Sequence, residues 1–194
     1  MSINRRALIA VAAVAVVAIV AIGLLQSDSQ STSSPTPLTS EQVRERVAGA
    51  PAALAAVHAQ GNELLGGGKA ALDARIKGLR GHPVVVNVWG SWCDPCRAEF
   101  PIFQHVAVEH ARDVAFLGVD TLDPAGKAKR FLATVPVPYP SYQDLKGTIA
   151  HSYGLQVTPG TIFYDRRGRQ FLHQGPYHSK ADLEADVRKY ALGV

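Results

Sequence analysis

The chain contains two cysteines, Cys93 and Cys96, with two residues between them. At the start of a helix, this spacing places both thiols on one face, about one turn apart, where they can form a readily exchanged disulfide. A thiol at a helix N-terminus ionises more easily, because unpaired backbone N–H groups and the helix dipole stabilise an anion. Cys93 therefore has the position of an attacking thiolate, and Cys96 that of a more sheltered resolving thiol.

Two other uses of this pair are a structural disulfide and half of a metal site. A disulfide here would close a loop of about four residues, which stabilises a fold only slightly. The chain has too few cysteines for an all-cysteine zinc site, and its seven histidines are scattered, with none beside the pair. We therefore predict redox exchange without a metal or another cofactor, and metal carriage by the dithiol is the alternative.

The residues on both sides of the pair predict the elements that position it. Residues 84–89 (VVVNVW) form a continuous, largely β-branched run, which is typical of a strand buried on both faces. A helix is predicted from Pro95 to about Arg112, and Pro95 has the φ that a first helical position requires. Pro101 lies inside this helix and removes a backbone hydrogen bond, so we expect a kink there.

The rest of the chain predicts an α/β fold. Strands are predicted at 114–119, 161–164 and 169–173, helices at 124–133, 146–153 and from Ser179 onwards, and a proline-rich loop or edge at 135–142. The order β-α-β-α-α-β-β-α indicates a central mixed sheet flanked by helices, with parallel crossovers and one antiparallel edge hairpin.

The first residues have the composition of a membrane anchor. Residues 7–25 are uncharged and mostly apolar, and a helix of that length covers roughly 28 Å, close to the ~30 Å core of a bilayer. Arg5 and Arg6 precede this run, so the positive-inside rule places the N-terminus in the cytoplasm. We expect residues 1–25 to be a cytoplasmic stub and a single transmembrane anchor in the cell membrane; a cleaved signal peptide is the alternative.

Three segments follow this anchor. Residues 26–39 are rich in Ser, Thr and Pro, which predicts a flexible linker. Residues 40–80 are Ala-rich and have a helical pattern, which predicts a helical extension of the sheet domain at 81–194. The formal net charge of +4 comes from basic residues interspersed with acids, so we expect no nucleic-acid partner.

Residues 84–101 (VVVNVWGSWCDPCRAEFP) resemble the active-site stretch of the thioredoxin superfamily, most closely that of the membrane-anchored TlpA/ResA-like thiol–disulfide oxidoreductases. The resemblance covers roughly residues 81–192 and implies a thioredoxin-like fold. It includes Val157-Thr158-Pro159, which is similar to the loop whose cis-proline faces the dithiol. The resemblance implies that Pro159 is cis and that the backbone of Thr158 pairs with an extended substrate strand.

Four further residues of the motif have expected roles. Trp92 is expected to shield the dithiol, and Trp89 to pack in the sheet. Asp94 and Pro95, between the cysteines, are expected to contribute to substrate binding. The negative charge of Asp94 opposes the Cys93 thiolate and makes the dithiol less oxidising, which favours a reductase.

Proton transfer is assigned to Glu99. Thioredoxins proper have a buried Asp on the strand before the motif, but Asn87 occupies that position and cannot accept a proton. Glu99 lies three residues after Cys96, and TlpA/ResA-like proteins carry a Glu at the matching place, so we expect Glu99 to accept the proton of Cys96. The alternative is a solvated carboxylate paired with an Arg on the helix surface.

The resemblance implies an extracytoplasmic enzyme that reduces disulfides of exported proteins. Apocytochrome c is a plausible substrate, which would place the enzyme in cytochrome c biogenesis, and a transmembrane partner would supply the electrons. A disulfide-forming oxidase with the same active site is the first alternative, and a non-catalytic metal carrier or binding module is the second. A peroxidase is disfavoured, because Gly90-Ser91-Trp92 precedes Cys93 in place of the Thr-x-x-Cys arrangement of peroxiredoxins.

Overall fold

A computed structural model describes residues 34–194. The predicted membrane anchor and the first residues of the predicted linker lie outside this range. Among the residues that the structure describes, no helix is both long and apolar enough to cross a bilayer.

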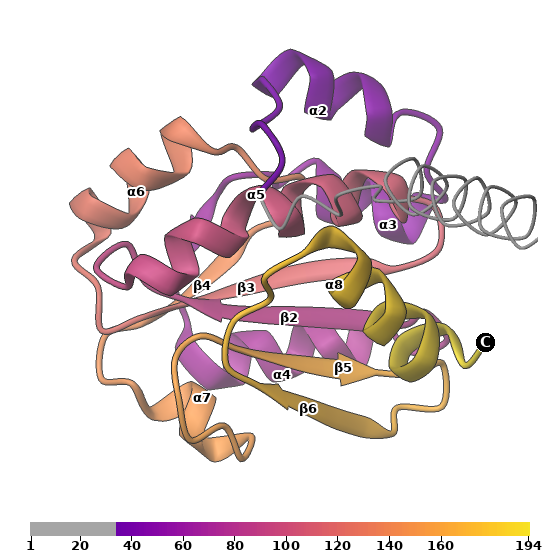
Figure 1. Ribbon diagram of the computed structural model, residues 1–194. Helices are drawn as coiled ribbons and strands as arrows, with labels where there is room; N and C mark the ends of the chain where they lie inside the picture. Colours follow the sequence, from indigo (N-terminus) through magenta and orange to yellow (C-terminus); the bar gives the residue numbers. More distant parts are fainter. Residues whose placement is uncertain (1–33) are drawn as a thin grey trace, which may run out of the picture. The chain divides into compact units, whose positions relative to one another are not determined.

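A mixed sheet of six strands, in the order β1-β4-β3-β2-β5-β6, forms the centre of residues 34–194 (Figure 1). The strands are β1 (Leu64–Leu65), β2 (Val84–Trp89), β3 (Ala115–Thr121), β4 (Ser141–Asp144), β5 (Gly160–Tyr164) and β6 (Gln170–Gln174). The first four run parallel to one another, whereas β5 is antiparallel to both β2 and β6. Strands β2 and β3 are buried along their whole length, as expected for strands covered on both faces.

Helices cover both faces of this sheet. The helices are α2 (Ser40–Val47), α3 (Ala52–His58), α4 (Gly68–Gly78), α5 (Asp94–Glu109), α6 (Ala125–Thr134), α7 (Thr148–Ser152) and α8 (Lys180–Asp186), which continues into the π-helical segment η1 (Val187–Leu192). Trp89 points to one face of the sheet and packs on Phe100 of α5. Helix α5 in turn packs against α8. Tyr142 points to the other face, where Arg75 of α4 donates a hydrogen bond to its hydroxyl.

A glycine makes the packing of Trp89 possible. Nε1 of Trp89 donates a 3.0 Å hydrogen bond to Oγ of Ser141, across the intervening strand β3. A Cβ at Gly118, the residue between them, would lie 2.1 Å from Oγ of Ser141 and 3.1 Å from Nε1 of Trp89. The prediction that Trp89 packs in the sheet is therefore confirmed.

The predicted elements after residue 80 are confirmed, with shifted ends and one change. The segment 135–142, predicted as a loop or edge, leads into β4, which lies inside the sheet between β3 and β1. The two prolines Pro138 and Pro140 precede β4 and hid its start, because prolines interrupt the apolar pattern of a strand.

The prediction that the segment 40–80 is helical is correct only in part. It contains α2, α3 and α4, but also β1, which pairs in parallel with β4 and so extends the sheet. A strand of two residues, Leu64 and Leu65, is too short to produce the alternating pattern by which strands are predicted.

The end of the predicted linker packs against α5. Leu38 is buried, and the side chain of Gln104 on α5 accepts a 2.6 Å hydrogen bond from Leu38 N and donates a 2.9 Å bond to Leu38 O. Ser34 Oγ also donates a 2.6 Å bond to the carbonyl of Ala98 on the same helix. Residues 34–39, the end of the predicted linker, contain no helix or strand and are attached to α5 by the buried Leu38 and by these hydrogen bonds.

Candidate active site

Cys93 and Cys96 form a disulfide where β2 leads into α5, with an Sγ–Sγ distance of 2.03 Å. Cys93 is the N-cap of α5, and the backbone N–H of Cys96 donates a 3.3 Å hydrogen bond to Cys93 Sγ. Cys93 is 4% exposed and Cys96 has no exposed surface. The structure therefore confirms the predicted placement of one sulfur at the helix terminus and the other further inside.

The residues between the two cysteines begin the helix. Asp94 is the first residue of α5 and Pro95 the second, where a fixed φ is compatible with the helix and no N–H is needed. Both are exposed, so they border the surface from which a partner would reach Cys93.

Two hydrogen bonds hold the loop before Cys93 on the end of β3. Ser91 N donates a 2.6 Å bond to Oδ2 of Asp123, and Trp92 Nε1 donates a 3.0 Å bond to the carbonyl of Thr121. The indole of Trp92 lies on the backbone of Gly90, where a Cβ would come within 2.4 Å of its Nε1. Trp92 remains 50% exposed, so half of this anchored ring is available to a partner.

The peptide bond between Thr158 and Pro159 is cis, as predicted. It directly precedes β5, in which Gly160 is paired with Val88 of β2. Continuing this antiparallel register places Pro159 beside Trp89, at the end of β2 from which residues 90–93, here called the dithiol loop, begin. Thr158 is partly exposed at this edge, and its pairing with a substrate strand stays a prediction.

Glu99 is buried, with 1% of its surface exposed, and lies on α5 three residues after Cys96. Asn87 Nδ2 donates a 3.0 Å hydrogen bond to its Oε1, and Tyr177 N donates a 2.8 Å bond to its Oε2. Burial raises the pKa of Glu99 to about 8, although both hydrogen bonds act in the opposite direction. The alternative of a solvated surface carboxylate is therefore wrong.

Further buried polar groups lie near Glu99. Oδ1 of Asn87, Oγ1 of Thr161 and the hydroxyl of Tyr139 have no hydrogen-bond partner within residues 34–194. Asn87 and Thr161 are directly paired residues of β2 and β5. Burial and the charge of Glu99 raise the pKa of Tyr139, so this hydroxyl stays protonated. Glu99 thus lies among neutral polar groups, and its protonated and ionised forms are equally populated at about pH 8.

Two further buried carboxyl groups, those of Asp120 and Asp123, were not predicted from the sequence. Asp120 and Asp123 are each 1% exposed, and Asp123 is the acceptor for Ser91 N. Burial and the charges of Asp123 and Asp144 raise the pKa of Asp120 to about 8. Asp123 Oδ2 accepts the hydrogen bond from Ser91 N, whereas both oxygens of Asp120 are buried without a hydrogen-bond partner within residues 34–194. The available signal was an acid at the end of the apolar run 114–119.

The described residues contain no cluster of three or more His, Cys, Asp or Glu side chains able to hold a metal ion. The groups gathered at this end of the sheet are a disulfide, two carboxyl groups with raised pKa values and an exposed tryptophan. This arrangement suits proton-coupled exchange at sulfur.

Comparison with known proteins identifies relatives of the chain. Thiol:disulfide interchange protein DsbE of Pseudomonas fluorescens biotype C is 34% identical over 91 residues, which are 46% of this chain and 49% of that protein. Thiol-disulfide oxidoreductase ResA of Geobacillus thermodenitrificans is 27% identical over 98 residues, which are 50% of this chain and 56% of that protein. The chain thus spans about half the length of these relatives.

Solved structures show the same fold. The structure of MTB dsbF in its mixed oxidised and reduced forms matches with a TM-score of 0.55 and 29% identity, covering 58% of this chain and 84% of that one. A putative thiol:disulfide interchange protein DsbE from Chlorobium tepidum matches with a TM-score of 0.54 and 29% identity, covering 59% and 83%. The predicted thioredoxin-like fold is therefore confirmed.

The model of the AhpC/TSA family matches residues 62–169. The match begins before residue 81, the predicted start of the sheet domain, and so includes β1. Since it spans more than half of the 194 residues, the chain belongs to the AhpC/TSA family, within the thioredoxin superfamily.

Proposed function

We propose that this protein is a thiol–disulfide oxidoreductase whose redox centre is the Cys93–Cys96 pair. The observation that carries the proposal is the disulfide at the N-terminus of α5, with one sulfur at the helix cap and the other fully buried. A disulfide that served stability alone would gain little from a loop this short. Two relatives of the chain, thiol:disulfide interchange protein DsbE and thiol-disulfide oxidoreductase ResA, are named for the same chemistry.

In the reduced protein, the Cys93 thiolate attacks one sulfur of a substrate disulfide. A mixed disulfide forms, and the second substrate sulfur leaves as a thiolate. The Cys96 thiolate then attacks Cys93 Sγ, which releases the first substrate sulfur and closes the Cys93–Cys96 disulfide. Two electrons have passed to the substrate, and a dithiol donor must return them before the next cycle.

Glu99 takes the proton of Cys96 before the second attack. Glu99 is the third residue after Cys96 on α5, a spacing that brings side chains to one face of a helix. The pKa of about 8 for Glu99 is close to the ordinary thiol value of about 8.5, so the proton can move in either direction with little driving force. Oxidation and reduction can then use the same carboxyl group.

We further propose the direction and the setting of the reaction. Asp94 next to Cys93 disfavours the thiolate and makes the dithiol less oxidising, which supports a reductase. The apolar run at 7–25 supports an anchor in the cell membrane with the catalytic domain outside the cytoplasm. Exported disulfide proteins, including apocytochrome c, are then the substrates, and a transmembrane protein is the electron donor.

A disulfide-reduction assay with the full chain tests the activity. The wild-type protein is expected to catalyse reduction of a peptide disulfide by dithiothreitol, and the variant Cys93→Ser is expected to lose this catalysis completely. Substitution of the exposed Ser152 by Ala is the matched control, since Ser152 lies on α7 and outside the dithiol loop. Equal rates with and without Cys93 would overturn the proposal.

The reduction potential of the Cys93–Cys96 couple separates reductase from oxidase. A reductase has a potential near that of thioredoxin, about −270 mV, whereas a strong oxidant such as DsbA lies near about −120 mV. A value near the second figure would replace the reductase by the alternative oxidase with the same active site.

A further inference from the structure

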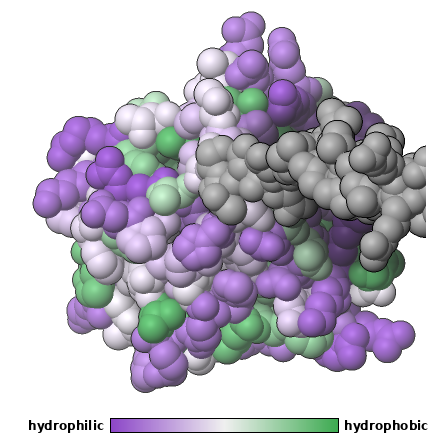
Figure 2. Space-filling view, in the orientation of Figure 1, coloured by the Kyte–Doolittle hydropathy of each residue, from purple (hydrophilic) through white to green (hydrophobic). Residues whose placement is uncertain are grey.

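A basic pocket opens beside the dithiol loop, between the start of α5 and helix α6. It has a volume of about 360 Å³ and is lined by Ser91, Arg97, Lys127, Arg130, Phe131 and Thr134. The surface over α6 is mostly hydrophilic, at the left of the molecule in the view of Figure 2. We call this cavity the α6 pocket.

Three of its lining residues carry positive charge, and none carries negative charge. Arg97, Lys127 and Arg130 are all exposed, and within residues 34–194 none of them forms an ion pair. The guanidinium of Arg97 lies 5.7 Å from the ring centroid of Phe131, a contact that orients it at the pocket wall. The pocket therefore presents cations that the described part of the chain does not neutralise.

The acids nearest in sequence to the lining residues do not line the pocket. Glu99, two residues after Arg97, is buried and accepts hydrogen bonds from Asn87 and Tyr177. Asp123 is buried and accepts the hydrogen bond from Ser91 N, and Asp120 is also buried. Asp94 is exposed at the start of α5, but it does not line the cavity.

The location of the pocket connects it to the exchange reaction. Ser91 lies two residues before Cys93, and Arg97 directly follows Cys96. Lys127 and Arg130 are three residues apart on α6, so they lie on the same face of that helix. A polypeptide that brings a disulfide to Cys93 from this side passes over the α6 pocket.

We propose that the α6 pocket binds an acidic segment next to the reacting disulfide of the substrate protein. This inference rests on the proposed function and adds a substrate class to it. Two arginines and a lysine around one cavity suit carboxylate side chains, because guanidinium groups bind carboxylates in bidentate fashion. Opposite charges next to the reacting sulfurs would raise the rate of productive encounter and select substrates by sequence.

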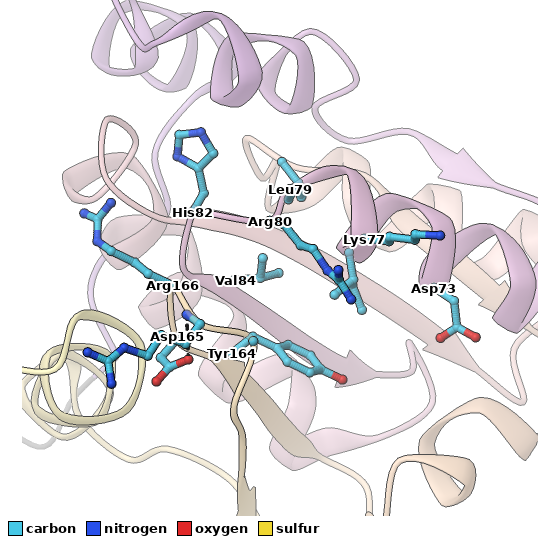
Figure 3. A pocket seen from close by; sticks show the side chains of 12 residues that line it. Asp73, Lys77, Leu79, Arg80, His82, Val84, Tyr164, Asp165 and Arg166 are labelled. Carbon is cyan, nitrogen blue, oxygen red and sulfur yellow. Dashed lines mark hydrogen bonds between the residues drawn. The ribbon is translucent and has the colours of Figure 1, made fainter.

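A second basic pocket provides the control. It has a volume of about 290 Å³, and its lining includes Lys77, Arg80, His82 and Arg166, together with the acids Asp73 and Asp165 (Figure 3). Val84, the first residue of β2, also lines it, whereas the dithiol follows the last residue of that strand. Its charges therefore lie at the other end of β2 from the reacting sulfurs.

Two peptide disulfides that differ only in flanking residues, glutamate in one and glutamine in the other, test the proposal with the full-length protein. The wild-type protein is expected to give the acidic peptide a kcat/KM about five- to tenfold higher, and 0.5 M NaCl is expected to remove most of this preference. The double variant Lys127→Glu/Arg130→Glu is expected to lose or invert the preference. The matched double variant Lys77→Glu/Arg80→Glu, with the same change in net charge, is expected to retain it.

The outcomes separate the pocket from the activity. If the wild-type protein exchanges both peptides equally well, or if Lys127→Glu/Arg130→Glu keeps the preference, the pocket assignment is wrong while the oxidoreductase activity stands. An equal loss of the preference for the acidic peptide in both double variants would show a general effect of net charge. That result would also overturn the pocket assignment. If neither peptide is exchanged by the wild-type protein, the proposed function itself fails.

Discussion

Asn87 Nδ2 donates a 3.0 Å hydrogen bond to Oε1 of Glu99, and this bond joins the centre of β2 to the first turns of α5. An amide at residue 87 cannot accept a proton, but it fixes the carboxyl group that can. Tyr177 N, from the segment between β6 and α8, holds the other oxygen at 2.8 Å. The position of Glu99 is therefore set by two segments outside its own helix.

Substitution of Glu99 by Gln removes the titrating group while keeping its size. We expect release of the mixed disulfide by Cys96 to slow by about a hundredfold, because the variant cannot accept the thiol proton. The wild-type rate is expected to rise with pH through about 8, where Glu99 is half ionised, and the rate of the variant is expected to lack this rise. Quenched-flow mass spectrometry between pH 6 and 9 measures both rates.

The control for that experiment is Glu109→Gln, a carboxyl-to-amide change at the last residue of the same helix. It is expected to leave the lifetime of the mixed disulfide unchanged. An unchanged lifetime and pH profile in Glu99→Gln would remove Glu99 from the mechanism.

The free energy of unfolding is expected to fall as pH rises from about 5 to about 8. Glu99 and Asp120 both have pKa values raised to about 8 in the folded protein, from 4.5 and 3.8. The folded state therefore binds more protons than the unfolded state across this interval, and each extra proton contributes a slope of about −1.4 kcal/mol per pH unit.

The variant Asp120→Asn isolates the contribution of Asp120. A buried amide stays neutral at every pH, so we expect a shallower slope and a more stable protein than wild type at pH 8. Urea unfolding at pH 5, 6.5 and 8 measures this, with Asp113→Asn as an exposed control. A slope equal to that of the wild-type protein would show that Asp120 is ionised throughout.

Asp123 positions the dithiol loop through its bond to Ser91 N. The variant Asp123→Ala is expected to lose about 1–3 kcal/mol of stability, because Ser91 N–H loses its acceptor. Hydrogen exchange at the Ser91 amide is expected to accelerate, whereas Asp123→Asn, which keeps an acceptor oxygen, is expected to retain most of the protection. Equal exchange in wild type and Asp123→Ala would contradict this role.

Gln104 attaches the residues before α2 to the domain. Besides its two bonds to Leu38, its Nε2 donates a 2.5 Å bond to the carbonyl of Pro136. We expect Gln104→Ala to lose about 2–4 kcal/mol of stability and to speed proteolytic cleavage within residues 34–39. The exposed Gln156→Ala is the control, and cleavage at the same rate in both variants would contradict the attachment.

Local patterns in the sequence were sufficient for the redox motif and for most of the sheet domain. The apolar run at 84–89 and Pro95 predict the junction between β2 and α5. Both signals depend only on residues that are close together in the sequence. Resemblance to a family added what local patterns lack, namely the cis bond at Pro159 and the choice of Glu99 as the candidate proton acceptor.

Features that depend on distant contacts were missed. The strand β1 has two residues and exists because β4 pairs with it, and β4 itself was obscured by prolines. Leu38 gave no signal within a Ser/Thr/Pro-rich segment, since its partner Gln104 lies 66 residues away. Asp123 meets Ser91 N, 32 residues away, through tertiary structure, and the burial that raises the pKa of Asp120 depends on the whole fold, so neither could be predicted from the sequence.

Covalent trapping tests the central claim, that Cys93 is the sulfur that attacks other disulfides. The reduced variant Cys96→Ser is incubated with a peptide disulfide, and adducts are located by mass spectrometry. We expect one peptide on Cys93, releasable by dithiothreitol, and no adduct in the matched variant Cys93→Ser, because Cys96 is fully buried. No adduct on Cys93, or an equally rapid adduct on Cys96 in the second variant, would contradict the account.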